Sequence, residues 1–516
     1  MQNRVMTVAH GERRLNRQSN RLRRAGRVCL AVFAFFALLN SNRAVGVFTL
    51  GPQVRMESPL RGMVVVGPLY GLAALGAVLW LTGVGMPAVF QTRRVSETFR
   101  VWVELIYGRV LRSRAGVVSG LLAVLIVLAL IRLCCAPDPV EALLAVAALA
   151  VLAGTFAFVV IERPEAHQVA KLTVAAAAIH AAVGVAQFLR QADAGLWFLG
   201  EARLDPALSG ISVLQIGEER VLRAYGLMPH PNNLGALLAM GLIAAVELWV
   251  WTERRQRYVW LASAALILAG LALSFSRAAW LGGAAALAGL GMSHKPVGGF
   301  SLNLERPNSR LRLWAFLLAL VGCQIGLLAV WKPELFWVRL TAASPLEYQS
   351  LWMRGLGIQT ALQIIQEHWW WGVGTRHYLE AAARLTGQPP TALFPVHNVP
   401  LLLWAENGLG AAAAWIALGL FTLALGWRQI VRSQDRRTLA GLSLATAWMV
   451  CIQVVSLFGY SYAPTQNLQA PLWLGLTCGL WAASCGFDSD PAPAERLSSF
   501  CRAAGDKPVG RPGNPG

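Results

Sequence analysis

The stretch that decides the fold is residues 223–252, RAYGLMPHPNNLGALLAMGLIAAVELWVWT. Its second part is apolar over a length that matches the hydrocarbon thickness of a bilayer, which predicts a transmembrane helix. Two prolines stiffen the entry to that helix, and Asn232 or Asn233 can cap its first turn. The positive end of the helix then lies beside Arg223, an arrangement that is typical of an anion-binding site.

Apolar runs of similar length recur through most of the chain. Of its 516 residues, 56% are hydrophobic and 14% are charged, a composition that excludes a soluble globular protein. The runs predict an all-α, polytopic membrane bundle of about 12 transmembrane helices. The predicted spans cover residues 28–50, 63–90, 116–135, 140–161, 171–189, 233–252, 258–275, 278–292, 313–331, 397–426, 439–460 and 470–486.

The basic residues predict the orientation of the bundle. The formal net charge of +19 invites a nucleic-acid partner, but the cations sit in an N-terminal arm and in short links between apolar runs. This distribution is typical of cytoplasmic loops, so we predict no nucleic-acid partner. With about 12 spans, every basic link falls on one side, which predicts a multi-pass protein of the inner (cytoplasmic) membrane with both termini in the cytoplasm. The basic segments are 1–27, 91–114, 253–257, 293–312 and 428–437.

One long outer loop, residues 332–396, separates the ninth and tenth predicted spans. Residues 344–347, SPLE, form a capping box with proline at the first helical position, which predicts a helix to about His368. Three tryptophans at 369–371 then suit an anchor at the level of the lipid headgroups. A second short helix is predicted near 376–385, so the loop should lie on the periplasmic or extracellular surface as an amphipathic cover.

Four polar clusters fall on the outer side in this topology: residues 223–233, residues 274–277, Arg354 in the loop helix, and residues 397–410 at the start of the tenth span. Arg354 and His397 place a permanent cation and an imidazole that can exchange protons at the membrane surface. This pair suits chemistry on a lipid diphosphate. Guanidinium groups can bind the leaving phosphates, and the imidazole can accept a hydroxyl proton.

The order of these clusters resembles the O-antigen ligase and polymerase superfamily over roughly residues 220–426. The matching features are Arg-x-x-Gly-x-x-x-His-Pro-Asn, then Ser-x-Ser-Arg, then an arginine helix that ends in Gly-x-Gly, then His-Asn followed by a glutamate and two glycines. The departures are modest. The last glycine spacing after Glu406 is short, and three tryptophans replace the proline that usually precedes Gly-x-Gly.

The resemblance implies an inverting, metal-independent glycosyltransferase of polysaccharide or lipopolysaccharide biosynthesis in the cell envelope, without a cofactor. The donor would be a glycan on undecaprenyl diphosphate, and the acceptor would be a glycan or lipid A core at the lipid bilayer. The expected catalytic residues are His397, Arg223 and Arg354. The expected substrate-binding residues are Arg277, His230, Asn232, Asn398 and Arg376, and no residue is expected to bind a metal.

The expected organisation is a cytoplasmic basic arm (1–27), N-terminal transmembrane helices (28–219), a ligase-like core (220–426), C-terminal transmembrane helices (427–486) and a disordered cytoplasmic tail (487–516). Alternative functions remain open. A ligase and a repeat-unit polymerase differ in acceptor, which the sequence does not specify. A transporter or flippase usually has ionisable residues at mid-membrane, and the predicted spans hold few of them. One of these, Glu406, falls opposite His397 on an ideal helix, so a hydrogen bond to a neighbouring helix is expected for it.

Overall fold

The structure is a computed structural model that describes residues 21, 23–28, 116–133, 139–199, 201–252, 255–293, 322, 326, 333–341, 344–466 and 469–485. All of them belong to one compact unit of the chain. The basic arm before residue 21, the predicted spans at 28–50, 63–90 and 313–331, and the predicted tail lie almost entirely outside the described residues.

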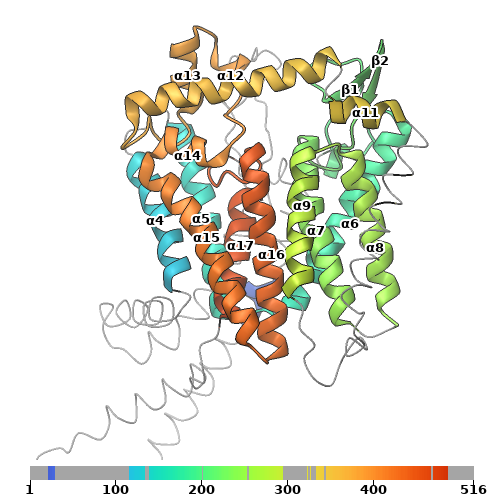
Figure 1. The fold of residues 1–516 in the computed structure, drawn as a ribbon, viewed down its shortest axis with the longest axis vertical. Helices are drawn as coiled ribbons and strands as arrows, with labels where there is room; N and C mark the ends of the chain where they lie inside the picture. Colours follow the sequence, from blue (N-terminus) through green and yellow to red (C-terminus); the bar gives the residue numbers. More distant parts are fainter. Residues whose placement is uncertain are drawn as a thin grey trace, which may run out of the picture. The chain divides into compact units, whose positions relative to one another are not determined.

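The described part is a bundle of membrane-length helices with a cover of shorter elements at one end (Figure 1). By length and composition, six described helices could cross a membrane. This confirms a mostly helical fold with several candidate membrane spans, and the total of about 12 spans stays a prediction. The long helices are α4 (Gly116–Leu133), α5 (Pro139–Glu162), α6 (Ala166–Arg190), α7 (Pro231–Trp251), α15 (Leu409–Arg432) and α16 (Arg436–Phe458), and shorter apolar helices are α8 (Arg257–Leu273), α9 (Arg277–Ser293) and α17 (Gln469–Ser484).

Helix α7 is the most enclosed of the candidate spans, because α6, α8, α9 and α16 all pack against it. Small residues allow this close packing, as is usual for helices in lipid. A Cβ atom added to Gly241 on α7 would lie 2.3 Å from the Cβ of Ala177 on α6. Between α9 and α16, a Cβ added to Gly282 would lie 2.7 Å from Cγ2 of Val455. Small residues therefore bring α7 close to α6, and α9 close to α16.

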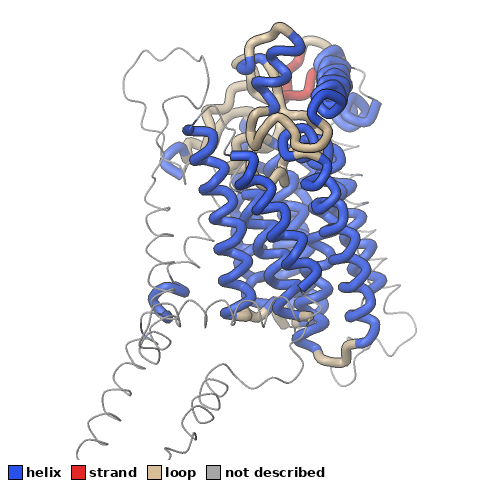
Figure 2. The backbone as a smooth tube through the Cα atoms, turned by 90° about the vertical axis from the view of Figure 1, so that its left-hand side faces the viewer, coloured by secondary structure: helices blue, strands red, loops and turns tan. Residues whose placement is uncertain are grey.

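The cover lies at the end of the bundle opposite the basic link between α15 and α16, as Figures 1 and 2 show. This arrangement agrees with the predicted separation of the long loop from that basic link. A β-hairpin between α6 and α7 was not predicted, and its turn uses Gly217 at a positive φ of 56°. The elements of the cover are η1 (Trp197–Leu199), β1 (Val213–Ile216), β2 (Glu219–Leu222), α11 (Pro333–Thr341), α12 (Pro345–His368), α13 (Tyr378–Thr386) and η2 (Pro390–Ala392).

Helix α12 begins and ends where the sequence predicts. The hydroxyl of Ser344 accepts the backbone N–H of Glu347 at 3.2 Å, and Pro345 occupies the first turn. The carboxylate of Glu347 departs from the predicted capping box, because its hydrogen bonds are with the guanidinium of Arg339 on α11. The N-terminus of α12 is thereby tied to α11.

The prediction of one continuous span at 397–426 is wrong. The chain forms two helices there, α14 (Val399–Asn407) and α15, because Gly408 breaks the helix at φ 83°. The backbone after α12 pairs with the break: the N–H of Gly374 donates to the carbonyl of Glu406 at 2.8 Å, and the N–H of Leu409 donates to the carbonyl of Trp369 at 3.0 Å. These bonds satisfy backbone groups that the break exposes and fasten the C-terminal end of α12 to the bundle.

Candidate functional site

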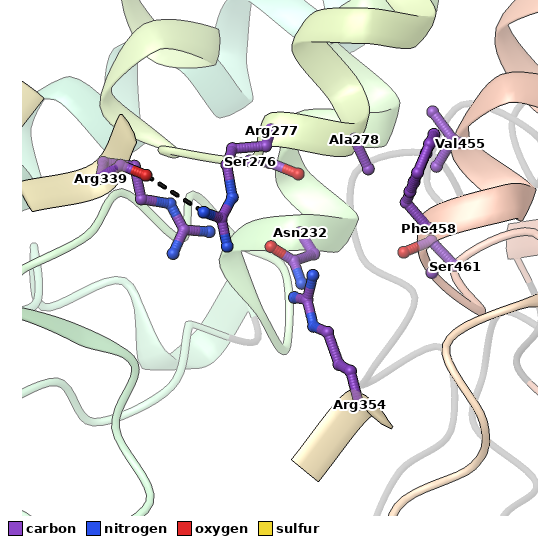
Figure 3. A pocket seen from close by; sticks show the side chains of 10 residues that line it. Asn232, Ser276, Arg277, Ala278, Arg339, Arg354, Val455, Phe458 and Ser461 are labelled. Carbon is purple, nitrogen blue, oxygen red and sulfur yellow. Dashed lines mark hydrogen bonds between the residues drawn. The ribbon is translucent and has the colours of Figure 1, made fainter. Parts of the chain in front are cut away.

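A cavity lies where α9 and α16 meet α12 at the end of the bundle that carries the cover (Figure 3). Each wall comes from a different part of the sequence, so the fold itself assembles the site. The lining residues are Asn232, Ser276, Arg277, Ala278, Arg339, Arg354, Val455, Phe458, Gly459 and Ser461.

Arg277 enters the cavity from the first turn of α9. The sharp turn before it falls at the boundary between the predicted spans 258–275 and 278–292, and it places the fully buried Phe275 at a positive φ of 48°. The Nη1 of Arg277 donates to the backbone carbonyl of Arg339 at 3.2 Å. Its Nη2 is buried, lies 3.6 Å from the carboxylate of Glu347 and makes no hydrogen bond among the described residues. Arg277 therefore keeps an N–H group available beside the cavity.

Arg354 reaches the cavity from α12, and its guanidinium extends toward Asn232 (Figure 3). Its Nε is buried and has no hydrogen-bond partner within the described part of the chain. Burial first, and then the positive charges of Arg339 and Arg277, lower the pKa of Arg354 to about 10. The side chain still carries its charge at neutral pH. A charged guanidinium group with a buried nitrogen that makes no hydrogen bond is a strong attractant for an anion.

Arg223 lies next to the cavity, but protein acceptors already occupy its guanidinium. Its Nε and Nη2 both donate to the carbonyl of Ser274, at 2.9 and 2.6 Å. Its Nη2 also donates to Oδ1 of Asn232 at 3.0 Å, and its Nη1 donates to the hydroxyl of Ser212 at 2.8 Å. The side chain is buried, and the pKa of Arg223 is lowered by burial first and by the charge of Arg339 second. This geometry suits a residue that orders its neighbours.

His397 lies just before α14, next to the turn that carries the lining residues Gly459 and Ser461. Its ring packs edge-on against Tyr460, with 5.1 Å between the ring centroids. Burial and then the charge of Arg354 lower the pKa of His397 to about 4, so the imidazole is neutral at neutral pH. Among the described residues, no hydrogen-bond partner holds this ring. A neutral imidazole with free nitrogens can accept a proton.

The other predicted polar residues take structural positions around the cavity. His230 is the N-cap of α7, since its Nδ1 accepts the N–H of Asn232 at 3.1 Å. The interpretation of Asn232 or Asn233 as the cap is therefore wrong: the Oδ1 of Asn232 accepts from Arg223 instead, and Asn232 lines the cavity. Burial, followed by the charge of Arg223, lowers the pKa of His230 to about 3, so its ring is also neutral.

Asn398 joins two helices. Its Oδ1 caps α14 by accepting the N–H of Leu401 at 2.9 Å, and its Nδ2 donates to the carbonyl of Leu457 on α16 at 3.1 Å. The adjacent His397 is thereby held at the end of α16. The predicted role of Asn398 in substrate binding remains a prediction, and both ends of its amide are engaged by the protein.

Arg376 lies away from the cavity lining. Its guanidinium forms an ion pair with Glu141 on α5 and donates to the carbonyl of Thr465. The sequence predicts a hydrogen bond from Glu406 to a neighbouring helix; its Oε1 instead accepts from Nε2 of Gln466, in the turn before α17, at 2.9 Å. Arg376 thereby fastens the cover to the bundle.

Two residues of the site carried no signal in the sequence. Arg339 belongs to α11, which no motif marks, and arginine is the usual cation of this chain. Tyr460 lies in the turn between α16 and α17, beyond the range of the resemblance. Glu347 was predicted as a capping residue, and the structure shows it as the carboxylate that balances Arg339 and approaches Arg277.

The assembled site combines two capabilities. Arg277 and Arg354 hold positive charge and unbonded donors at the cavity, and His397 holds a neutral imidazole beside it. Such a site can bind an anion with several oxygens and take a proton from a nearby hydroxyl group.

Comparison with known proteins finds a family match over part of the chain. No curated protein matches the chain. The family described as O-antigen ligase matches residues 262–416, a range that contains Arg277, Arg339, Arg354 and His397. The match indicates a membrane enzyme of the O-antigen ligase or polymerase type that acts on lipid-linked glycans. It supports membership of this chain in the O-antigen ligase superfamily.

Proposed function

We propose that this protein transfers a glycan from undecaprenyl diphosphate to an acceptor hydroxyl on the outer side of the cytoplasmic membrane. The observation that carries the proposal is the pair of unbonded guanidinium nitrogens of Arg277 and Arg354 at one cavity, with the neutral imidazole of His397 beside it. The family match supports the same class of substrate.

The donor diphosphate binds between Arg277 and Arg354. Each guanidinium offers planar N–H groups that match phosphate oxygens, and their buried setting strengthens the contact. The carboxylate of Glu347 offsets Arg339 and keeps Arg277 within reach of the cavity. Negative charge grows on the diphosphate as it leaves, so these contacts stabilise the transition state more than the bound donor.

The acceptor hydroxyl oxygen attacks the anomeric carbon of the donor sugar from the face opposite the diphosphate. The new glycosidic C–O bond forms while the bond from the anomeric carbon to the phosphate oxygen breaks, which inverts the configuration. The hydroxyl proton passes to an imidazole nitrogen of His397, and the bonding electrons leave with undecaprenyl diphosphate. Arg223 does not need to contact the donor in this scheme, because it orders Asn232 and the turn at Ser274.

Purified protein and an undecaprenyl-diphosphate-linked glycan test the proposal. We expect His397→Ala and Arg354→Ala to lower the rate of transfer by about 10²–10³-fold, the usual cost of losing one such group. The matched controls are His368→Ala and Arg384→Ala, since both side chains are exposed on the cover. Transfer at the wild-type rate by His397→Ala protein that is correctly inserted would refute the role of the imidazole as base.

The acceptor decides between two versions of the reaction. Deletion of the gene, followed by gel analysis of the surface glycan, separates them. Loss of all polymer on its lipid anchor indicates a ligase, and accumulation of a single repeat unit indicates a polymerase. An unchanged glycan profile would contradict both versions.

A further inference from the structure

We propose that Tyr460 is a positioning residue that fixes the imidazole of His397 by ring packing, in place of the hydrogen-bonded partner that usually orients a catalytic histidine. The inference rests on the proposed function for the role of His397 in transfer. Tyr460 lies outside the matched residues 262–416, in the turn that joins α16 to α17.

The turn that carries Tyr460 is fastened to the first turns of α7. The hydroxyl of Ser461 donates to Oδ1 of Asn233 at 3.0 Å. The hydroxyl of the buried Tyr462 donates to the carbonyl of Ala236 at 3.0 Å. Both residues that follow Tyr460 are hydrogen-bonded to α7, so the backbone of Tyr460 is held in place.

His397 is held near Tyr460 by the hydrogen bonds of its neighbour Asn398. Asn398, the next residue, caps α14 through the N–H of Leu401 and binds the last turn of α16 through the carbonyl of Leu457. Tyr460 lies two residues after the end of α16 at Phe458. Hydrogen bonds made by neighbouring residues thus bring the two rings together, and none of these bonds involves either ring.

The contact between the rings has the geometry of an aromatic pair. Their centroids are 5.1 Å apart and their planes are inclined by 73°, which is an edge-to-face arrangement. Both rings are half-buried. Within the described part of the chain, His397 has no carboxylate or carbonyl partner on either ring nitrogen. Packing against Tyr460 is therefore what limits the rotation of the imidazole, and both nitrogens remain available to an acceptor hydroxyl.

The charges around His397 agree with this role. The groups that face it are Arg354 from α12, His230 from the entry to α7, and Tyr460. Burial raises the pKa of Tyr460 and outweighs the opposing charge of Arg354, so the phenol stays protonated. A neutral tyrosine ring shields one side of the imidazole from water and helps to keep the pKa of His397 low.

The test compares two substitutions in the full-length protein: Tyr460→Phe keeps the ring, and Tyr460→Leu removes it. Tyr348→Leu is the matched control, because Tyr348 on α12 is 69% exposed. One measurement is glycan transfer, with kcat and the donor KM determined separately. The other is the pH dependence of His397 modification by diethyl pyrocarbonate, followed by mass spectrometry, since this reagent attacks the neutral imidazole.

We expect Tyr460→Phe to match the wild-type protein in both measurements. Tyr460→Leu should lower kcat by about 10²-fold, the cost of misplacing a catalytic group, with little change in donor KM. It should also raise the pH midpoint of His397 modification. Tyr460→Met serves as the second variant if size-exclusion chromatography shows that leucine impairs assembly.

Two results would overturn the inference. The first is wild-type kcat and an unchanged modification midpoint in Tyr460→Leu. The second is loss of kcat in Tyr460→Phe, because the hydroxyl and not the ring would then be required. Absence of transfer by the wild-type protein would refute the proposed function alone, and the modification midpoint would still decide the role of Tyr460.

Discussion

The arginines at and beside the cavity differ in what their donors already bind. The guanidinium of Arg223 donates to Ser274, Asn232 and Ser212. In contrast, Arg277 and Arg354 each retain a buried nitrogen without a hydrogen bond. A buried donor without a partner costs about 1–3 kcal/mol, and a bound anion removes that cost. The residues most suited to hold a diphosphate are therefore Arg277 and Arg354, although the sequence predicts Arg223 as a catalytic residue and Arg277 only as a substrate-binding one.

Substitution of Arg223 by lysine should destabilise the protein and slow transfer. A single ammonium group lacks the planar fork that reaches Ser274, Asn232 and Ser212 together, and each buried acceptor left unpaired costs about 1–3 kcal/mol. We expect a lower Tm in detergent and loss of transfer of at least about tenfold. Arg220→Lys on the exposed hairpin is the control. Wild-type Tm and rate in Arg223→Lys would show that its charge alone is sufficient.

The pH dependence of transfer should report His397. The base must be neutral, so activity falls as the pH drops through its pKa, which burial and then Arg354 lower from 6.5 to about 4. We expect kcat/KM to stay level from neutral pH down to about pH 5 and to fall below it. Arg354→Gln removes one cause of the low pKa, and the acid limb of its residual activity should move upward. An acid limb that stays in place in Arg354→Gln would contradict electrostatic coupling of the two side chains.

At the scale of elements, the site depends on how α12 is held. Its N-terminal end is tied to α11 by the buried pair of Glu347 and Arg339, and Arg339 also donates from Nε to the carbonyl of Phe275 at 2.7 Å. The segment after its C-terminal end pairs with the helix break at Gly408. Arg354 lies on α12 between these two attachments, so loss of either attachment can displace its side chain.

The first attachment can be tested with Glu347→Gln. Removal of this carboxylate leaves Arg339 buried without its counter-charge, and breaking such a pair costs about 3–5 kcal/mol. We expect a clear fall in Tm and in transfer. Glu367→Gln is the matched control on the same helix, where the side chain is 61% exposed. Equal Tm values for the two variants would contradict the role of Glu347 in holding α12.

The second attachment can be tested with Gly408→Ala. A Cβ atom there would lie 1.9 Å from the carbonyl oxygen of Trp370, and the φ of 83° strains any residue with a side chain. We expect the segment after α12 to separate from the break, with increased proteolysis of the cover and reduced transfer. Gly355→Ala is the control, because nothing lies within 4 Å of an added Cβ in the middle of α12. Resistance to proteolysis equal to that of Gly355→Ala would refute the attachment.

At the scale of the whole molecule, the sequence predicts what depends on local signals. The bounds of α12, the turn before Arg277 and the placement of the polar clusters at one end of the bundle follow from capping residues, apolar runs and charged links. The break at Gly408 was missed, because the backbone partner that stabilises it comes from a distant segment. Arg339 and Tyr460 were missed for the same reason: only the fold brings Arg339 to the cavity and Tyr460 to His397.

The central claim is that Arg277 and Arg354 bind the lipid diphosphate while His397 acts only in the transfer step. Equilibrium binding of undecaprenyl diphosphate to the purified wild-type protein, Arg277→Gln/Arg354→Gln and His397→Ala tests it most directly. We expect the double variant to bind at least about tenfold more weakly, since each charged hydrogen bond contributes about 1.5–3 kcal/mol. His397→Ala should bind like the wild-type protein and fail to transfer. Wild-type affinity in the double variant would contradict the account.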